Sequence, residues 1–255
     1  MAVATTKDFT SIREEYAFFF QHATQADRDA SAYLPLLHQL PPGPIRFLDF
    51  GCGPGGFTAR LLRMLALPPE RLWLSLVEPV EVYRREALTE LQQFTAHPID
   101  AWPALPAAVA GPFRVVLANH VFYYVPDLDT QLKAIISNLA PDGVFLIAIA
   151  AQDSTLIQLW NRWYARIGKQ VPYHTAEDVE AVLGQLPVRV LKERVDFDLV
   201  FPDTEENRLK IVRFLMGHDW SALPRDEALA PFDSYSSGGQ IAIRSGQPHF
   251  VVRHR

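Results

Sequence analysis

Cysteine is nearly absent from this sequence of 255 residues, which contains a single one, Cys52. One cysteine cannot form a disulfide within the chain, and a structural zinc site built on paired cysteines needs more than one. We therefore expect Cys52 to be a small packing residue, and we expect no metal in the protein.

Positive charge is not in excess either, because 29 acidic residues stand against 24 lysines and arginines and give a formal net charge of −5. A nucleic-acid partner is disfavoured, since phosphate contacts depend on lysine and arginine.

The sequence also lacks the roughly 18 consecutive apolar residues of a membrane-spanning helix. Residues 1–13 lack the apolar centre of a signal peptide. We expect a cytoplasmic protein, a monomer or weak dimer, without a membrane or nucleic-acid partner.

Two reactive-lysine motifs are missing from the chain as well. No Tyr-x-x-x-Lys pair and no Gly-x4-Gly-Lys run occurs in it. These motifs supply the reactive lysine of short-chain dehydrogenases and of P-loop enzymes. Their absence argues against both classes.

Short apolar runs alternate with longer amphipathic stretches between residues 45 and 150. This alternation is typical of a parallel sheet that is covered by helices on both faces. It predicts strands at 45–50, 72–77, 113–117 and 143–150, and helices at 56–67, 80–93 and 128–139. The fold class that follows is α/β.

The length and the 49% hydrophobic content are enough for one three-layer domain over residues 1–255. We expect a helical lid in residues 1–44, with two helices within 12–40, and a cofactor-binding half in 45–150. A substrate-binding half and the last strands are expected in 151–255. This last part is predicted to hold a helix around Trp160, a helix from near Thr175, and further elements at 188–201, 205–216, 240–244 and 249–252.

A glycine-rich loop follows the first predicted strand. It runs Asp49-Phe50-Gly51-Cys52-Gly53-Pro54-Gly55-Gly56, and residues without a Cβ let a ligand approach the backbone. Gly51, Gly53 and Gly56 also fit the dinucleotide pattern Gly-x-Gly-x-x-Gly, in which a pyrophosphate lies at a helix N-terminus. Asp49 weighs against that cofactor, because a carboxylate repels a pyrophosphate and attracts an ammonium group.

Two further carboxylates follow the next predicted strands. Glu78 ends the strand at 72–77, where it would accept hydrogen bonds from ribose hydroxyls. Asp100 follows a third predicted strand. Three carboxylates at three strand ends predict a nucleoside cofactor that carries an amino group. The alternative is that Glu78 and Asp100 only cap helices.

These carboxylates, the glycines and the strand at 115–119 resemble class I S-adenosylmethionine methyltransferases over residues 45–150. The resemblance implies a Rossmann-like fold with a mostly parallel, seven-stranded sheet and a helical insertion over the substrate. It implies S-adenosyl-L-methionine as cofactor and S-adenosyl-L-homocysteine as product. The implied cofactor contacts are Asp49, Gly51, Cys52, Gly53, Gly55, Glu78, Asp100, Ala101 and Asn119.

A narrower likeness to histamine N-methyltransferase extends over more of the chain, in the segments 20–25, 77–79, 119–125, 159–160 and 250–252. Gln25 stands where that family has a glutamate, and no asparagine stands at 245–247, where it has one. Without the carboxylate, a pocket attracts an ammonium tail less strongly. A different amine or a less cationic acceptor than histamine is therefore expected. The implied acceptor contacts are Tyr16, Gln25, His120, Tyr123, Tyr124, Trp160 and Phe214.

We expect N-methylation of a small amine or nitrogen heterocycle by direct in-line transfer, in which holding the two reactants in line supplies most of the acceleration. His120 is the candidate base where the acceptor must lose a proton, and Tyr124 is the second catalytic candidate. The alternatives are a small-molecule O-methyltransferase, a nicotinamide-dependent oxidoreductase, and a binding protein that has lost turnover. In the plainest interpretation, His120 and the aromatic residues are ordinary packing residues.

Overall fold

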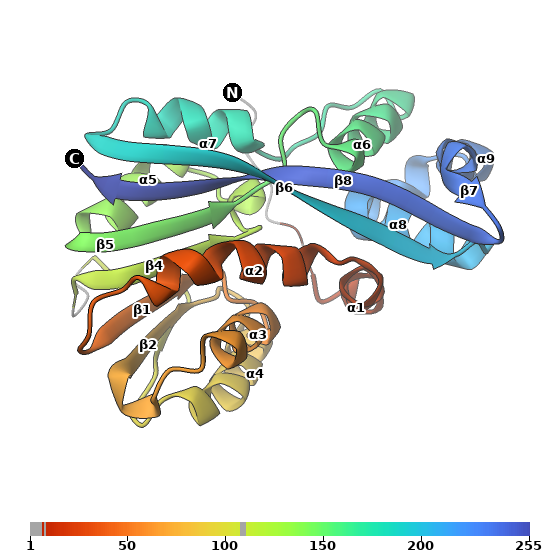
Figure 1. The fold of residues 1–255 in the computed structure, drawn as a ribbon. Coiled ribbons are helices and arrows are strands. Elements are labelled where there is room, and N and C mark those ends of the chain that lie inside the picture. The colour runs from red at the N-terminus through yellow and green to blue at the C-terminus, as the bar shows by residue number, and fades with distance from the viewer. Residues whose placement is uncertain (1–6, 8, 108–110) are drawn as a thin grey trace.

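The computed structural model describes residue 7 and residues 9–107 and 111–255. An eight-stranded sheet lies at the centre, in the order β3-β2-β1-β4-β5-β8-β6, with β7 paired to β8 (Figure 1). The strands are β1 (Ile45–Phe50), β2 (Leu72–Val77), β3 (Asp100–Trp102), β4 (Phe113–Asn119), β5 (Leu139–Ala148), β6 (Val188–Pro202), β7 (Ser236–Ser237) and β8 (Gln240–His254).

Strands β1 to β5 run parallel, whereas β8 and β6 are antiparallel to their neighbours. The register sets Asp49 of β1 beside Leu76 of β2 and Leu117 of β4. Because parallel strands share one direction, the loops after β1, β2 and β4 leave the same edge of the sheet. The glycine loop and the segments after Val77 and Asn119 are therefore gathered at this edge.

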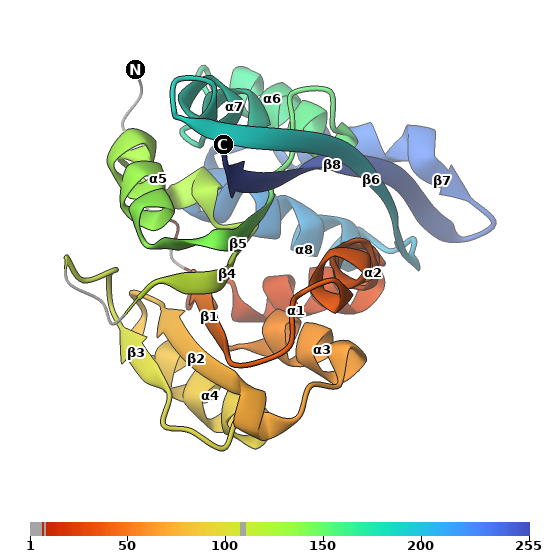
Figure 2. The same cartoon turned by 60° about the vertical axis from the view of Figure 1, so that its left-hand side comes forward.

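Helices cover both faces of the sheet (Figure 2). Helices α2, α3 and α4 pack on one face, and α5 and α7 on the other. Successive residues of β1 enter opposite cores, Phe47 the first and Leu48 the second, which explains why both of these neighbouring residues are apolar. Among the helices of the described residues, none is long and apolar enough to cross a membrane. The α-helices are α1 (Arg13–His22), α2 (Gln25–His38), α3 (Gly56–Leu65), α4 (Glu81–Leu91), α5 (Leu128–Ser137), α6 (Thr155–Arg166), α7 (Ala176–Leu183), α8 (Glu205–Met216) and α9 (Arg225–Leu229).

The strands β6 and β8 form a long antiparallel pair. Each has 15 residues, and they pair from Val188 opposite His254 to Pro202 opposite Gln240. The pair continues beyond the edge of the parallel strands, and α6, α8 and α9 lie beside it there (Figure 1). Helix α1 packs against α8, and Ala23 bridges to β6 at Leu199. The N-terminal helices therefore contact the C-terminal half of the chain directly.

The predicted Rossmann-like α/β architecture is confirmed, with differences in detail. Strand β5 begins at Leu139, whereas a helix was predicted to reach this residue and the strand to begin at 143. The runs 240–244 and 249–252 form one strand, because Ser245 to Pro248 also pair with β6. The two-residue strand β7 brings the sheet to eight strands, where seven were expected. Asp100 begins β3, whereas the sequence placed it after a strand. The single domain, with a lid and two halves divided at residues 44 and 150, stays a prediction.

Leu146 tests where the core lies. It is fully buried in β5, between Leu117 of β4 and Val251 of β8. We expect Leu146→Ala to lower the free energy of unfolding by about 2–5 kcal/mol, because the change removes apolar contacts and leaves a cavity. Leu191→Ala, at an exposed position of β6, is the control and should change it by about 0.5 kcal/mol or less. Urea denaturation measures both, and equal losses would contradict this position of the core.

Candidate active site

A cavity of about 850 Å³ opens at the carboxyl ends of the parallel strands. Its wall comes from the loops after β1, β2 and β4, from α1 and α2, and from α6, α8, β6 and β8 of the C-terminal half. A volume in this range can hold a cofactor together with a small second molecule. The glycine loop and the predicted aromatic residues therefore border one space.

The glycine loop fits tightly against the loop after β4 at one point and leaves open space at another. Gly51 has φ +79°, and a Cβ added there would lie 2.2 Å from a methyl carbon of Val121. Gly53 also has a positive φ, but a Cβ there would meet nothing within 4 Å. Gly51 thus sets the contact between two loops, whereas Gly53 borders room for a ligand.

Asp49 is a buried carboxyl group at the end of β1, 3% exposed. The Thr58 hydroxyl donates a hydrogen bond to it. Burial raises the pKa of Asp49 to about 7, and the negative charge of Glu78 adds to the rise. A nearby cation would favour the ionised form. The position therefore suits a ligand with an ammonium group.

Glu78, just after β2, ties the glycine loop to the start of α4. One carboxylate oxygen accepts a hydrogen bond from the Gly53 amide at 2.9 Å, and the other accepts from the Val80 amide at 2.8 Å. Burial raises the pKa of Glu78. The side chain therefore does more than cap a helix, and its remaining lone pairs can accept from the hydroxyls of a ribose. Asp49, Gly53 and Glu78 together fit an amino-bearing nucleoside.

A second buried carboxylate, Asp29 of α2, collects hydrogen bonds from side chains far apart in the sequence. It accepts from Gln247 Nε2 at 2.7 Å, His249 Nε2 at 2.8 Å, His120 Nε2 at 3.0 Å and Asn119 Nδ2 at 3.2 Å. Burial alone would raise the pKa of Asp29, but the hydrogen bonds and charges of the two histidines lower it below its usual range. Among the described residues, no group of three or more His, Cys, Asp or Glu is placed to hold a metal ion.

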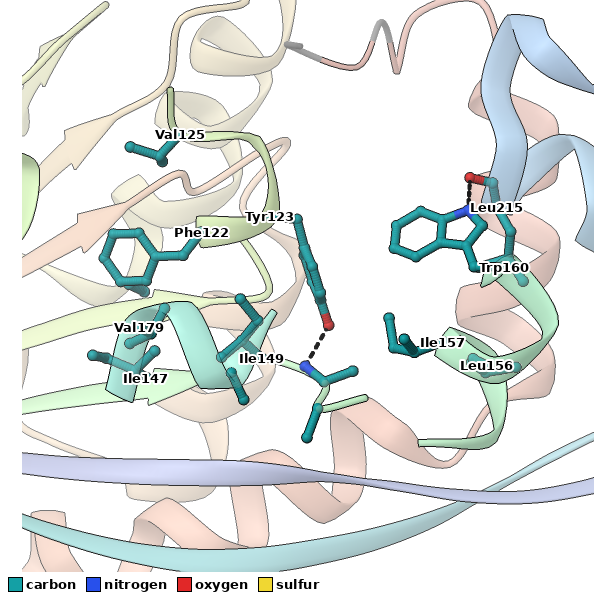
Figure 3. Close-up of a cluster of buried hydrophobic side chains, with 14 of the residues drawn as sticks. Phe122, Tyr123, Val125, Ile147, Ile149, Leu156, Ile157, Trp160, Val179 and Leu215 are labelled. Atoms are coloured by element: carbon teal, nitrogen blue, oxygen red, sulfur yellow. Dashed lines mark hydrogen bonds between the residues drawn. The ribbon is translucent and has the colours of Figure 1, made fainter. Parts of the chain in front are cut away.

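His120 follows β4 in a left-handed backbone conformation, with φ +58°, which few residues other than glycine adopt. Its Nε2 faces Asp29, and its Nδ1 lies 3.3 Å from the hydroxyl of Tyr123. That hydroxyl in turn accepts a hydrogen bond from the Ala150 amide at 2.7 Å (Figure 3). Because the ionised carboxylate of Asp29 can only accept at Nε2, Nδ1 is the nitrogen left to accept a hydrogen bond or a proton.

Aromatic side chains form the wall opposite the glycine loop. Tyr123 and Trp160 face each other, with ring centroids 6.1 Å apart and an interplanar angle of 80° (Figure 3). The Trp160 indole N–H donates to the carbonyl of Leu215, which fixes the ring against α8. Tyr16 and Phe214 lie beside this wall, with centroids 6.0 Å apart. These rings form an apolar part of the cavity wall, and Asp29, Asn119 and His120 form a polar part of the same wall.

Most of the predicted site residues border the cavity, and three do not. Gly55 is at the start of α3, where a Cβ would lie 3.1 Å from the backbone of Ala87. Asp100 is exposed and pairs with Ser75, two residues before the end of β2, and Ala101 follows it. The cofactor roles of these three residues stay predictions. The predicted residues that do border the cavity are Tyr16, Gln25, Asp49, Gly51, Cys52, Gly53, Glu78, Asn119, His120, Tyr123, Tyr124, Trp160 and Phe214.

Sequence reasoning missed Asp29, Gln247, His249 and Lys7. Asp29 lies one helical turn after Gln25, so a search along that helix face for the missing carboxylate would have found it. Gln25 Nε2 lies 3.3 Å from Gln247 Oε1, which links the predicted position to the observed carboxylate. Gln247 and His249 reach Asp29 only because β8 pairs beside β5, and no local pattern indicates that. Lys7 precedes every helix and strand.

Asp49 should make the stability of the protein without ligand depend on pH. An aspartate in the unfolded chain has a pKa of about 4, and burial raises that of folded Asp49 to about 7. The folded state then keeps a proton that the unfolded state has lost, so stability falls as pH rises from about 4 to about 7. Asp49→Asn cannot ionise and should be more stable than wild type at pH 8, by about 2–4 kcal/mol.

Thermal unfolding of both proteins at pH 4 and pH 8 measures this difference, which should nearly vanish at pH 4. A gain that is the same at both pH values would contradict the assignment. The same variant should bind S-adenosylmethionine about tenfold more weakly or worse, because an ammonium group loses its partner. If the substitution stabilises the protein and weakens ligand binding, Asp49 serves binding at a cost in stability.

Asp29 should be much more sensitive to substitution than its exposed neighbour on the same helix. In Asp29→Asn an amide replaces the acceptor of four hydrogen bonds, and we expect a loss of about 3–5 kcal/mol in the free energy of unfolding. Asp27→Asn removes only an exposed ion pair with Arg60 and should cost about 1 kcal/mol or less. Urea denaturation of both variants decides the matter, and similar losses would show that the buried group does not join the elements.

Comparison with solved structures shows the fold. The YcgJ protein of Bacillus subtilis is 13% identical and superposes with a TM-score of 0.58 over 90% of this chain and 99% of its own. Coclaurine N-methyltransferase, bound to N-methylheliamine and SAH, is 12% identical, with a TM-score of 0.52 over 88% of this chain and 70% of its own. At such identities the likeness concerns the fold alone.

Sequence comparison shows the family. Trans-aconitate 2-methyltransferase of Azoarcus sp. (strain BH72) is 31% identical over 136 residues, which are 52% of this chain and 48% of that relative. The chain thus spans about half the length of this curated relative. Residues 20–186, more than half of the chain, match the family described as Methyltransferase domain. The chain therefore belongs to the methyltransferase-domain family, whose enzymes transfer the methyl group of S-adenosylmethionine.

Proposed function

We propose that this chain transfers the methyl group of S-adenosylmethionine to a nitrogen of a small amine or nitrogen heterocycle. The observation that carries the proposal is His120, whose imidazole borders the cavity and is oriented by Asp29 on one side and Tyr123 on the other. When bound, the cofactor supplies an electrophilic methyl group on a sulfonium. The chain has to bind the two reactants, align them and receive a proton.

The donor end of the cavity is proposed to hold the cofactor through Asp49, Glu78 and the backbone of Gly53. The carboxyl group of Asp49 would face the ammonium group of the cofactor. Burial without a nearby cation raises the pKa of Asp49, and a bound ammonium group would favour its ionised form. Glu78 would accept from the ribose hydroxyls. A nicotinamide cofactor is disfavoured, since its pyrophosphate would meet the buried carboxyl group of Asp49.

The acceptor end is proposed to lie between His120 and the aromatic wall. An alkylamine has a pKa of about 10 and must lose a proton before it attacks, whereas an imidazole is mostly neutral at pH 7. Nδ1 of His120 would take that proton, and the carboxylate of Asp29 would stabilise the resulting imidazolium. The Oγ of Ser245 borders the same space, is buried, and has no hydrogen-bond partner among the described residues. It is a ready contact for a polar atom of the acceptor.

Tyr124 is proposed to position the acceptor. Burial raises the pKa of its hydroxyl far above the ordinary value, so it stays protonated and neutral. A neutral phenol can donate a hydrogen bond or offer its ring face, but it cannot serve as a base near neutral pH. The proton-accepting role therefore falls to His120, and the proposed likeness to histamine N-methyltransferase concerns the aromatic contacts.

A second candidate is methylation of a carboxylate oxygen. The Azoarcus relative is named for trans-aconitate, a tricarboxylate, and two basic side chains, Lys7 and Arg13, border the cavity. Such side chains bind carboxylates through charge-assisted hydrogen bonds. Under this candidate no proton has to be removed, because a carboxylate is already ionised at neutral pH.

Labelled S-adenosylmethionine offered with a panel of amines, nitrogen heterocycles and carboxylic acids separates the two. We expect a product whose label resists mild alkali, as an N-methyl group does. A product that releases all its label as methanol in alkali would be a methyl ester and would end the proposal of N-methylation.

His120→Gln should lower kcat for an alkylamine acceptor by about 100-fold, because glutamine cannot accept the proton. The control is His38→Gln, at the exposed end of α2 and outside the cavity wall, which should keep the activity of wild type. Steady-state kinetics measures both. An undiminished kcat in His120→Gln would show that His120 is not the proton acceptor.

A further inference from the structure

The ammonium nitrogen of Lys7 lies within a group of five aromatic rings. Side chains from three separate regions contribute, namely Tyr124 after β4, Trp160 of α6 and Phe214 of α8. The distances from Nζ to the ring centroids are 4.9 Å for Phe214, 5.5 Å for Phe9, 5.5 Å for Trp160, 5.9 Å for Tyr124 and 6.0 Å for Tyr173. Each ring is within the range in which a cation is attracted to an aromatic face.

Backbone carbonyls complete the surroundings of this nitrogen. Nζ of Lys7 donates hydrogen bonds to the carbonyl oxygens of Phe214 and Leu215, the latter at 3.2 Å. Both residues are in the last turn of α8, where carbonyls lack partners within the helix and the helix dipole favours a cation. We call the five rings and these two carbonyl oxygens the amine cage.

The amine cage binds its nitrogen without a carboxylate. Lys7 is 6% exposed, and within the described residues no acidic side chain forms an ion pair with it. Burial lowers the pKa of Lys7 to about 7. A site of this kind therefore accepts an amine in its neutral form as well as in its charged form. The neutral form is the one that can attack a methyl group.

The cage is continuous with the proposed acceptor site. The rings of Tyr123 and Tyr124 have centroids 5.6 Å apart, and the hydroxyl of Tyr123 adjoins His120 Nδ1. Lys7 itself belongs to no helix or strand, so its side chain is the part of this arrangement that is least fixed by neighbouring secondary structure. Trp160 and Phe214 come from helices α6 and α8, and Tyr124 from the short 3-10 helix at 122–124, whereas Phe9 and Tyr173, like Lys7, lie outside the helices and strands.

We propose that the amine cage is a binding site for an unbranched primary alkylamine of the acceptor, and that Lys7 occupies it as an internal substitute which the acceptor displaces. The inference rests on the proposed amine methylation for its role in the reaction. It adds the substrate class, an aliphatic amine on a flexible chain, and it requires the side chain of Lys7 to leave the amine cage when the acceptor enters. The competing account is that Lys7 stays in place and binds a carboxylate of the acceptor.

The test uses the atoms that a substitution removes. Lys7→Ala deletes Cγ, Cδ, Cε and Nζ, which together correspond to n-propylamine. We expect n-propylammonium to bind Lys7→Ala at least about tenfold more tightly than wild type, as judged by calorimetry and tryptophan fluorescence without any methyl donor. 1-Propanol, of similar shape but uncharged, should show no such gain. Lys7→Met keeps the cage filled with an apolar chain and should bind n-propylammonium no better than wild type.

Two further variants keep the result decisive. Adding Trp160→Leu to Lys7→Ala should abolish the gain, because a principal ring of the cage is lost. Lys192→Ala removes a different lysine placed over a ring, Phe250 at 5.6 Å, and should show no gain. If Lys7→Ala has lost its far-ultraviolet circular dichroism, Lys7→Ser replaces it. No gain in a folded Lys7 variant, or an equal gain for 1-propanol, would overturn the inference.

The amine cage and the proposed N-methylation can be rejected independently of each other. Amine binding in Lys7→Ala together with label found only in methyl esters would leave the amine cage standing and reject N-methylation. Label on nitrogen without amine binding in Lys7→Ala would do the reverse.

Discussion

The carboxylate of Asp29, on α2, lies where this helix meets the end of β4 and β8, and it accepts hydrogen bonds from side chains at the end of β4 and in β8. This buried carboxylate remains charged, because the hydrogen bonds and charges of the two histidines favour its ionised form. This junction holds His120 by one nitrogen and directs the other toward Tyr123. The geometry of the proposed acceptor end therefore depends on Asp29, which borders the cavity and orients His120 there.

The two buried aspartates show opposite electrostatics, and the difference divides the cavity. Asp29 has its pKa lowered by two histidines despite its burial, so its charge is already compensated within the protein. Asp49 has its pKa raised by burial, with one hydroxyl as partner. A charged ligand is required only at Asp49. The proposed donor end thus suits a cationic group, whereas the proposed acceptor end has a charge compensated within the protein and a wall of aromatic rings.

The sequence predicted what depends on local pattern. The alternation of apolar runs located β1, β2 and β4, and the glycines after Asp49 located a loop that borders the cavity, because such turns need residues without a Cβ. Contacts between distant segments were beyond it. Asp29 and His249 are 220 residues apart and meet only through the antiparallel pairing of β8. Asp100 shows that a local pattern can also mislead. The sequence placed it after a strand, but it begins the three-residue strand β3 and does not border the cavity.

Histidine side-chain nitrogen NMR on the intact protein tests the central arrangement most directly. If Asp29 accepts from Nε2 of both His120 and His249, each Nε2 must carry a hydrogen, and the nitrogen spectrum at neutral pH will show this for both rings. The resonances assigned to these two Nε2–H groups should move together in Asp29→Asn. A spectrum in which either Nε2 lacks its hydrogen in the wild-type protein would contradict the account.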